Sequence, residues 1–298
     1  MKTIVYACIA LVCMGTFTQC NSDSTKSGTA EDTTTAKTDS SVSTGSTAGF
    51  KIGAQMWTFR VFSFTDALAK VDSAGIKNIE AFHGQKLGGD MKGEFGIKMS
   101  ADDRAKLKKL LQSKGISIVA MGVISPKDKE EWIKDFDLAK EFGLSYITCE
   151  PNKTQWDVVD SLAGAYGIKI AIHDHPKPNA YWHPDSVLAA IKGHSNIGSC
   201  ADVGHWARNG LDPVDCLKKL EGHIYGVHLK DIVKFDDTQA ADTIVGTGVI
   251  KFTPIFQELK RQSFNGMMSI EHESNWEHNL PDVIQTVKFY NDQVAALK

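Results

Sequence analysis

Short apolar runs alternate with longer amphipathic stretches from residue 50 to the end of the chain. A run of apolar and β-branched residues predicts a buried strand, whereas apolar residues spaced three or four apart predict a helix with one buried face. We therefore predict eight strands, over residues 51–56, 77–82, 116–123, 144–149, 168–173, 197–202, 224–229 and 267–271. Helical patterns lie between the strands and after the last one, including those over 65–74, 102–113 and 129–142.

Glycine stands just before four of these strands, where a helix C-terminus favours a left-handed residue: Gly75, Gly115, Gly143 and Gly167. Eight strand–helix units in about 249 residues match the size of a (β/α)8 barrel. A doubly wound open sheet is the alternative, but no glycine-rich phosphate loop follows the first strand. The pattern therefore predicts one α/β domain, a (β/α)8 TIM barrel over residues 50–298.

The first fifty residues differ from the rest of the chain. An uncharged apolar run over 3–15 follows Lys2, and it is too short to span a bilayer, which is typical of a secretory signal. Over residues 21–48, 15 of 28 residues are Ser or Thr and none is aromatic, so we expect a flexible tether. The protein is therefore expected to be exported.

These N-terminal features, with Cys20 between the run and the tether, resemble a bacterial lipoprotein. The resemblance implies a signal peptide over 1–19, a Ser/Thr-rich linker over 20–49, and a lipid anchor on Cys20 as the one membrane attachment. The expected location is the periplasm or cell envelope. A plain cleaved signal is the alternative, because Gln19 occupies a position where lipoproteins usually carry a small residue.

Composition narrows the function classes. With 42% hydrophobic and 23% charged residues, the chain is neither collagen-like nor wholly disordered. Its net charge of -3 offers no basic face, so we expect no nucleic-acid partner. The domain cysteines, Cys149, Cys200 and Cys216, lack metal-ligand spacing and are expected to be buried hydrophobes. The sequence leaves the oligomeric state open.

In a barrel of this kind, chemistry takes place where the strands end at the C-terminal face. Here those ends carry many potential metal ligands: Glu150, the His173-Asp174-His175 run, Asp202 with His205, His228 with Lys230 and Asp231, and Glu271 with His272 and Glu273. So many carboxylates would repel one another without a cation. Three carboxylates and one imidazole, Glu150, Asp202, His228 and Glu271, suit a hard or borderline divalent metal.

The domain resembles the xylose isomerase-like TIM-barrel superfamily, the sugar isomerase and epimerase group that includes inosose dehydratases. The matching segments are Thr148-Cys149-Glu150-Pro151, Asp202-Val203-Gly204-His205, Val227-His228-Leu229-Lys230-Asp231 and Ser269-Ile270-Glu271. The resemblance implies one Mn, Co, Mg or Zn ion on Glu150, Asp202, His228 and Glu271. It also implies that His205 contacts a small carbohydrate substrate.

The chemistry of such a site follows from its groups. A divalent ion on a ketone oxygen and a neighbouring hydroxyl makes the adjacent C–H more acidic by stabilising the enediolate. Glu150 and Glu271, on the fourth and eighth strands, should face each other across the mouth and act as two bases. The sequence therefore predicts a metal-dependent isomerase or epimerase of a free or oxidised sugar, because export disfavours sugar phosphates.

Other functions remain open at this point. The same site can expel a leaving group, which makes a dehydratase or a 3-keto-glycoside lyase the main alternative. A phosphodiesterase resembling endonuclease IV is less favoured, because the segment after Asp231 lacks histidine. A non-catalytic sugar-binding lipoprotein is also less favoured, because all four ligands are present.

Further substrate contacts are expected around the mouth. Of His173 and His175, we expect only one to enter the mouth, and we take His175, nearer the strand end, as the contact. Lys230 is expected either to steady an enolate oxygen or to pair with Asp231. Aromatic rings stack on the apolar face of a sugar, so the tryptophans beyond strand ends are candidates, namely Trp57, Trp206 and Trp276.

Overall fold

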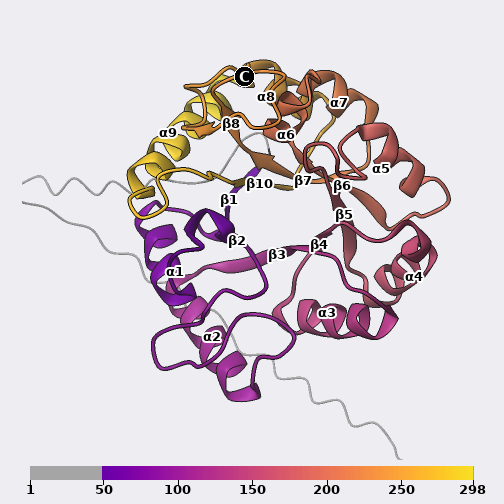
Figure 1. Ribbon diagram of the computed structural model, residues 1–298. Coiled ribbons are helices and arrows are strands. Elements are labelled where there is room, and N and C mark those ends of the chain that lie inside the picture. The colour runs from indigo at the N-terminus through magenta and orange to yellow at the C-terminus, as the bar shows by residue number, and fades with distance from the viewer. Residues whose placement is uncertain (1–48, 298) are drawn as a thin grey trace, which may run out of the picture. The chain divides into compact units, whose positions relative to one another are not determined.

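The computed structural model describes residues 49–297, and the expected signal peptide, Cys20 anchor and tether lie outside them. In the described part, eight parallel strands close into a barrel in the order β1-β10-β7-β6-β5-β4-β3-β2 (Figure 1). Their bounds are β1 Lys51–Gln55, β2 Asn78–Ala81, β3 Ser117–Ile124, β4 Tyr146–Cys149, β5 Lys169–His173, β6 Ile197–Asp202, β7 Ile224–Leu229 and β10 Met267–Ile270. The predicted TIM barrel is confirmed.

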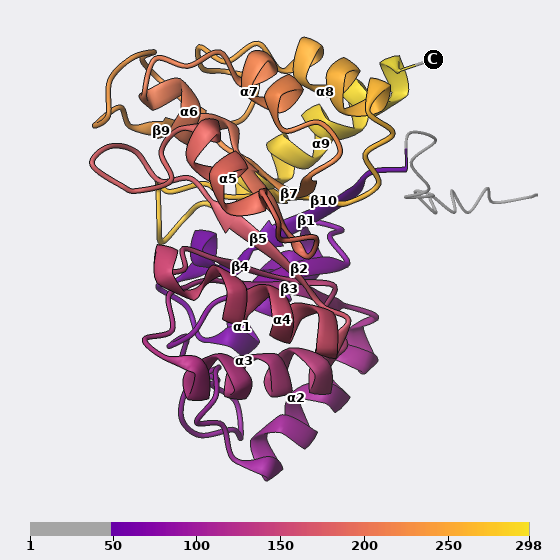
Figure 2. The same ribbon diagram turned by 90° about the vertical axis from the view of Figure 1, so that its right-hand side faces the viewer.

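Helices surround the ring of strands, as Figures 1 and 2 show from two directions. They are α1 Phe64–Ser73, α2 Ala101–Lys114, α3 Lys129–Phe142, α4 Trp156–Tyr166, α5 Pro184–Ile191, α6 Val203–Arg208, α7 Pro213–Lys219, α8 Phe252–Arg261 and α9 Leu280–Ala296, with 3-10 turns at Met56–Phe59 and Lys153–Gln155. None of the helices within residues 49–297 is both long enough and apolar enough to cross a membrane.

The helix ends follow local sequence signals. Side chains of Ser63, Ser100 and Asp128 accept hydrogen bonds from the first turns of α1, α2 and α3. All four glycines predicted before strands have positive φ, between 60° and 75°. The sequence-predicted boundaries are therefore close, although the first strand ends at Gln55 because Met56 begins a 3-10 turn.

Two regions were not anticipated. After β7, the short strands β8 Asp231–Ile232 and β9 Asp242–Thr243 pair antiparallel. The Asp231 carboxylate holds this excursion by accepting backbone hydrogen bonds from residues 232, 246, 248 and 250. The second region is the long connection between β2 and α2, which contains neither a helix nor a named strand.

The barrel interior is layered along its axis. At the N-terminal ends of the strands, five inward side chains form a separate buried cluster: Ala120, Tyr146, Ala171, Cys200 and Met267. Because alternate residues of a strand share a face, the same rows continue inward at Thr148 and Glu150, His173, Asp202, and Ser269 and Glu271. Each row thus passes from small or apolar side chains to polar or ionisable ones at the C-terminal ends, which we call the mouth.

Candidate active site at the barrel mouth

Four buried side chains converge on the floor of the mouth. Each of His173, Asp202, His228 and Glu271 offers one ligand atom, and these atoms all lie within 4.8 Å of one another. His228 Nδ1 lies 3.0 Å from Glu271 Oε2 and 3.1 Å from His173 Nε2. The structure therefore brings together three of the four predicted ligands, with His173 as the fourth member of the group.

The orientation of His228 is set from below. Its Nε2 lies 2.9 Å from Oε2 of Glu80, a fully buried carboxylate on β2. Ser269 Oγ donates to the same carboxylate oxygen at 3.3 Å. A proton on Nε2 leaves Nδ1 free to accept or ligate, facing Asp202 and Glu271. Glu80 thus fixes both the tautomer and the ring position of His228.

Asp202 has two oxygens in different roles. Its Oδ1 accepts from the backbone N–H of His205 at 2.9 Å and caps the N-terminus of α6. Its Oδ2 is buried and has no hydrogen-bond partner, although Lys230 Nζ lies 3.3 Å away. A buried carboxylate oxygen without a hydrogen bond is costly unless a cation satisfies it.

A metal fits this arrangement. The orphaned Asp202 oxygen faces His173 Nε2 at 3.7 Å and His228 Nδ1 at 3.9 Å, so the ligand atoms surround a common point. Carboxylate oxygen with imidazole nitrogen is a donor set suited to manganese, cobalt or zinc. Residues in the described part of the chain can therefore hold one divalent ion at the mouth, and its identity is not fixed by them.

Glu150 lies beside this group and not within it. Its Oε1 contacts His175 Nδ1, and its Oε2 accepts from Asn179 Nδ2 at 2.8 Å. The imidazole of His173, 3.8 Å from Glu150 Oε1, stands between Glu150 and the other three predicted ligands. Burial opposes the charged form of Glu150, but His173 and His175 outweigh it and lower its pKa, so the carboxylate is ionised.

The expectation that only one of His173 and His175 enters the mouth is wrong. Their Nδ1 atoms lie 3.3 Å apart and their ring centroids 4.5 Å apart. Residues two apart along a strand share a face, and His175 continues the row of His173 beyond the end of β5. The error lay in treating the pair as neighbours on opposite faces.

Lys230 is almost fully buried among carboxylates. Its Nζ lies 2.8 Å from Glu273 Oε2, 3.0 Å from Glu271 Oε2 and 3.3 Å from Asp202 Oδ2. Burial disfavours the charge on both Lys230 and Glu271, but attraction to Asp202 and then to Glu271 raises the pKa of Lys230, and attraction to Lys230 and then to His228 lowers that of Glu271. Lys230 does not pair with Asp231, whose carboxylate binds backbone N–H groups.

Gly204 explains how the Lys230 side chain reaches this position. A Cβ at Gly204 would lie 2.6 Å from Lys230 Cγ and 2.8 Å from its Cβ. The bare backbone at the start of α6 thus leaves room for the lysine methylenes.

Next along α6, His205 is flanked by two cations, with Arg208 Nη1 3.1 Å from its Nδ1 and Lys230 Nζ 3.3 Å from its Nε2. Burial lowers the pKa of His205; Asp202 opposes this shift, whereas Lys230 and the neighbouring imidazoles add to it, so the ring is neutral.

Above the floor lies a mouth cavity of about 310 Å³. It is lined by Gln55, Trp57, Phe82, His83, Gly122, Val123, His175, His205, Lys230, Glu271 and Glu273. Four predicted substrate contacts therefore reach the cavity: Trp57, His175, His205 and Lys230. Trp57 is fixed there, because its Nε1 donates to Glu273 Oε1 at 2.9 Å.

Two predicted contacts do not line this cavity. Trp206 on α6 is fully buried in the core, so neither face of its ring is open to a sugar. As the neighbour of His205 on a helix, it points in a different direction from the mouth. Trp276 lies over the Arg60 guanidinium, 3.7 Å from ring centroid to Cζ, at the rim beside Trp57.

Sequence reasoning missed several residues of the site. His173 and Glu273 were named among the potential ligands at the strand ends but were given no role, although the Glu273 carboxylate binds both Lys230 and Trp57. Glu80 and Arg208 were not assigned. The rule that alternate residues of a strand share a face could have identified Glu80 and His173, because both stand at inward positions at the ends of short strands. Arg208 carries no such signal, since its role depends on the β8–β9 excursion.

The fold and the ionisable groups at the mouth place the chain in one family of TIM barrels. The chain belongs to the xylose isomerase-like TIM barrel family, whose model matches residues 68–292. An inosose dehydratase of Clostridium botulinum is 25% identical over 262 residues, covering 72% of this chain and 83% of that protein.

Solved structures agree with this family. A putative uncharacterized protein from Parabacteroides distasonis is 36% identical, with a TM-score of 0.68 over 82% of this chain and 99% of its own. A D-tagatose 3-epimerase-like protein has a TM-score of 0.66 at 19% identity, covering 83% of this chain and 98% of its own. At that identity the likeness concerns the fold.

Proposed function

We propose that this protein is a divalent-metal-dependent enzyme that moves a proton at a carbon next to the carbonyl of a free or oxidised sugar, as an isomerase or epimerase does. The observation that carries the proposal is the convergence of Asp202, His228 and Glu271 on the mouth floor, where one Asp202 oxygen accepts no hydrogen bond. A set of ionisable groups buried this deeply at a barrel mouth is expected of a catalytic site.

Asp202, His228 and Glu271 would hold the ion, completed by His173 or by Glu150. When bound, the ion would stabilise the negative charge that develops on the substrate oxygens as the proton leaves. Glu80 keeps the His228 ring in position, and the capping contact to His205 holds Asp202. The chain thus presets these donors before substrate arrives.

The proton is handled by carboxylates on opposite sides of the mouth. Strands β4 and β10 are four places apart in the ring of eight, so Glu150 and Glu271 stand across from each other. Both are ionised, as a base must be. Lys230, in the cavity wall between Glu271 and His205, can donate a hydrogen bond to a substrate oxygen.

Elimination is the second candidate, with the protein acting as a dehydratase or a 3-keto-glycoside lyase. A specific observation favours it, because the relative from Clostridium botulinum is an inosose dehydratase. Proton abstraction beside the carbonyl is common to both outcomes. They differ in whether a group β to the carbonyl is then expelled, and the buried Lys230 ammonium in the cavity wall can donate a proton to assist that departure.

Substrate screening by NMR in deuterated water tests the proposal. Free sugars and 3-oxo-glucosides are incubated with the full chain and Mn²⁺. For epimerisation or isomerisation we expect deuterium on a sugar carbon, and for elimination we expect loss of the hydrogen beside the carbonyl together with release of the leaving group. Chelation of the metal should abolish either reaction. Metal-dependent epimerisation or isomerisation without any deuterium in the product, or elimination that retains the hydrogen beside the carbonyl, would contradict the shared step.

Export and lipid anchoring remain part of the proposal. They rest on the apolar run over 3–15 and on Cys20. We expect the full chain to be found with membranes and the Cys20→Ser variant to be released from them. Equal membrane association of both chains would contradict the anchor.

A further inference from the structure

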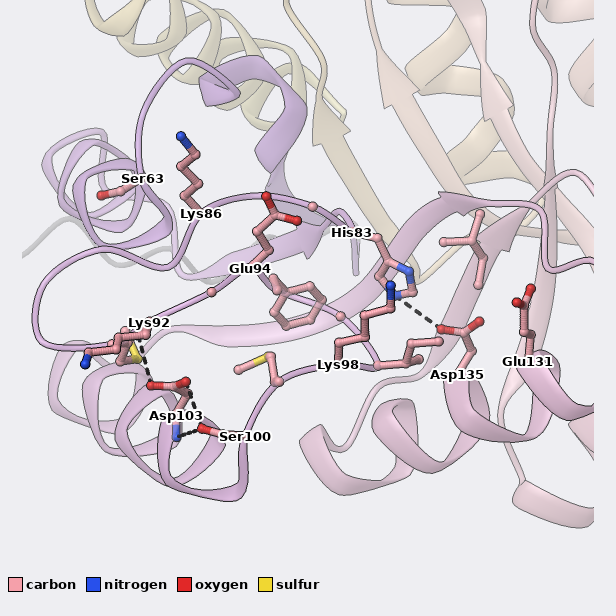
Figure 3. A pocket seen from close by; sticks show the side chains of 18 of the residues that line it. Ser63, His83, Lys86, Lys92, Glu94, Lys98, Ser100, Asp103, Glu131 and Asp135 are labelled. Atoms are coloured by element: carbon pink, nitrogen blue, oxygen red, sulfur yellow. Dashed lines mark hydrogen bonds and ion pairs between the residues drawn. The ribbon is translucent and has the colours of Figure 1, made fainter.

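Beside the mouth lies a second, larger cavity of about 1220 Å³, which we call the side cleft (Figure 3). One wall is the connection between β2 and α2, over residues 83–100. The other wall is formed by residues 123–126, at the end of β3 and just beyond it, with Glu131 and Asp135 of α3. No residue of the proposed metal group lines this cleft.

The side cleft adjoins the mouth. His83 and Val123 line both cavities, so these two side chains stand at the boundary between the two spaces. A longer molecule whose reacting end lies in the mouth would have to pass His83 to reach the side cleft. The mouth cavity, about 310 Å³, is at the small end for a ligand site, which leaves the rest of a longer molecule to the cleft.

The lining of the side cleft carries charges of both signs. Three lysines, Lys86, Lys92 and Lys98, share it with four carboxyl groups. Two of these carboxyl groups are already engaged, because Asp103 accepts from Ser100 and from the Lys92 backbone N–H, and Glu131 pairs with Lys127. The lysines therefore outnumber the carboxyl groups that remain to offset them.

Apolar side chains lie in and beneath the cleft wall. Met91, Phe95, Met99 and Ile124 are buried, and Phe95 stacks on Phe64 of α1 with ring centroids 5.5 Å apart, so these four side chains support the wall. The apolar side chains that a ligand can contact are Ile97 and Val123, which line the cleft and are partly exposed.

One polar group at the junction lacks a hydrogen bond. The Asp135 side chain is 4% exposed, and its Oδ1 has no hydrogen-bond partner. His83 Nε2 lies 3.2 Å from that oxygen, and Figure 3 shows the two side chains pointing toward each other. Burial raises the pKa of Asp135 to about 7 and lowers that of His83 to about 4. A neutral pair of this kind can donate to and accept from hydroxyl or ether oxygens.

We propose that the side cleft binds the non-reacting part of a glycoside, a ring with an apolar face, while the sugar that reacts occupies the mouth. This inference rests on the proposed function and names its substrate class as a glycoside in preference to a free monosaccharide. Asp135 and His83 would contact the oxygens near the linkage, and Ile97 and Val123 would contact the ring.

Isothermal titration with methyl and phenyl β-D-glucopyranoside tests the proposal, because neither contains a ketone and neither is expected to turn over. We expect phenyl glucoside to bind the full chain about tenfold more tightly than methyl glucoside. Ser125→Trp fills the cleft from one wall and Ile97→Trp from the other, and either should bring the ratio near one. The matched control is Ser113→Trp, on the exposed C-terminal turn of α2, outside the cleft lining, which should keep the ratio.

Equal affinities in the wild type, no binding of either glucoside, or a ratio unchanged in both occluding variants would each overturn the proposal. Thermal melts of every variant separate blocking from misfolding. The outcome is separable from the proposed function, because deuterium exchange reports on the mouth alone. Tighter binding of phenyl glucoside without deuterium exchange into a substrate would support the side cleft as a binding site and contradict the proposed reaction. Deuterium exchange without tighter binding of phenyl glucoside would support the reaction and contradict the role of the side cleft.

Discussion

The two ends of the barrel interior are built from the same rows of residues and differ in what those rows carry. At the N-terminal end, Tyr146, Cys200 and Met267 close the barrel with a buried cluster. Two to four residues further along the same rows stand Glu150, Asp202 and Glu271. One end is a plug that gains stability from burial, and the other keeps charges out of water at a cost in free energy.

This difference indicates that the mouth, and not the N-terminal end of the barrel, carries the functional site. Burying Asp202, Glu271 and Lys230 together is poor evidence of stabilisation, because desolvation offsets much of the attraction between such groups. An arrangement of this kind at a strand-end face is instead expected to have a function. Substitutions at the mouth should therefore change activity most, and those at the plug should change stability alone.

The largest expected effect is at Glu271. Glu271→Gln removes both a proposed base and a proposed ligand, so the rate of deuterium exchange into a substrate should fall about 10³-fold or more. Glu150→Gln should also abolish turnover. Exchange rates measured by NMR provide the check, with Met267→Leu in the plug as the control. Activity of either glutamine variant within tenfold of wild type would contradict the two-base assignment.

The next largest effect is expected from removing the buried ammonium group of Lys230. In metal-free protein, Lys230→Met leaves three carboxylates without their counter-charge, and the free energy of unfolding should fall by about 3–5 kcal/mol. Saturating Mn²⁺ should restore part of this loss. The control is Lys234→Met, because the Lys234 side chain is 70% exposed and pairs at the surface, where the loss should stay under about 1 kcal/mol. Urea denaturation measures both, and equal losses would argue against a special role for Lys230.

At the plug, Met267→Ala should lower the free energy of unfolding by about 2–4 kcal/mol, because the Met267 side chain is 1% exposed and its removal leaves a buried cavity. Its effect on the KM of a substrate should be negligible. Met267→Leu keeps the volume and should cost less than about 1.5 kcal/mol. A changed KM in the alanine variant would show that the two ends are coupled.

The smallest effect is a gain at the side cleft. Burial raises the pKa of Asp135 to about 7, so the folded state holds this proton more tightly than the unfolded chain. Stability from that proton is present below pH 4 and is lost as the pH rises toward 7. Asp135→Asn should therefore stabilise the protein by about 1–3 kcal/mol at pH 8, and the gain should vanish near pH 4. Urea unfolding at both pH values checks this, and a gain independent of pH would exclude titration of Asp135 as its cause.

Much of this architecture could be predicted from the sequence because it depends on local signals. Three signals are periodic or local in the chain: the alternation along strands, the glycines at helix ends and the polar residues at strand ends. From them the barrel was correctly predicted, and so was the meeting of Asp202, His228 and Glu271 at its mouth. The choice of partners could not be predicted. Lys230 contacts Glu273 and not its neighbour Asp231, because an excursion of the chain takes Asp231 away. The side cleft also escaped prediction, since residues 83–100 form it without helix or strand periodicity.

The central claim is that a divalent ion binds at the mouth through Asp202 and its neighbours. Chelator-treated full chain titrated with Mn²⁺ by calorimetry tests it most directly. We predict one ion per chain, with affinity reduced at least about 100-fold in Asp202→Asn and unchanged in Asp212→Asn, a surface helix cap. Absence of Mn²⁺ binding to the wild type, or equal affinity in wild type and Asp202→Asn, would contradict the account.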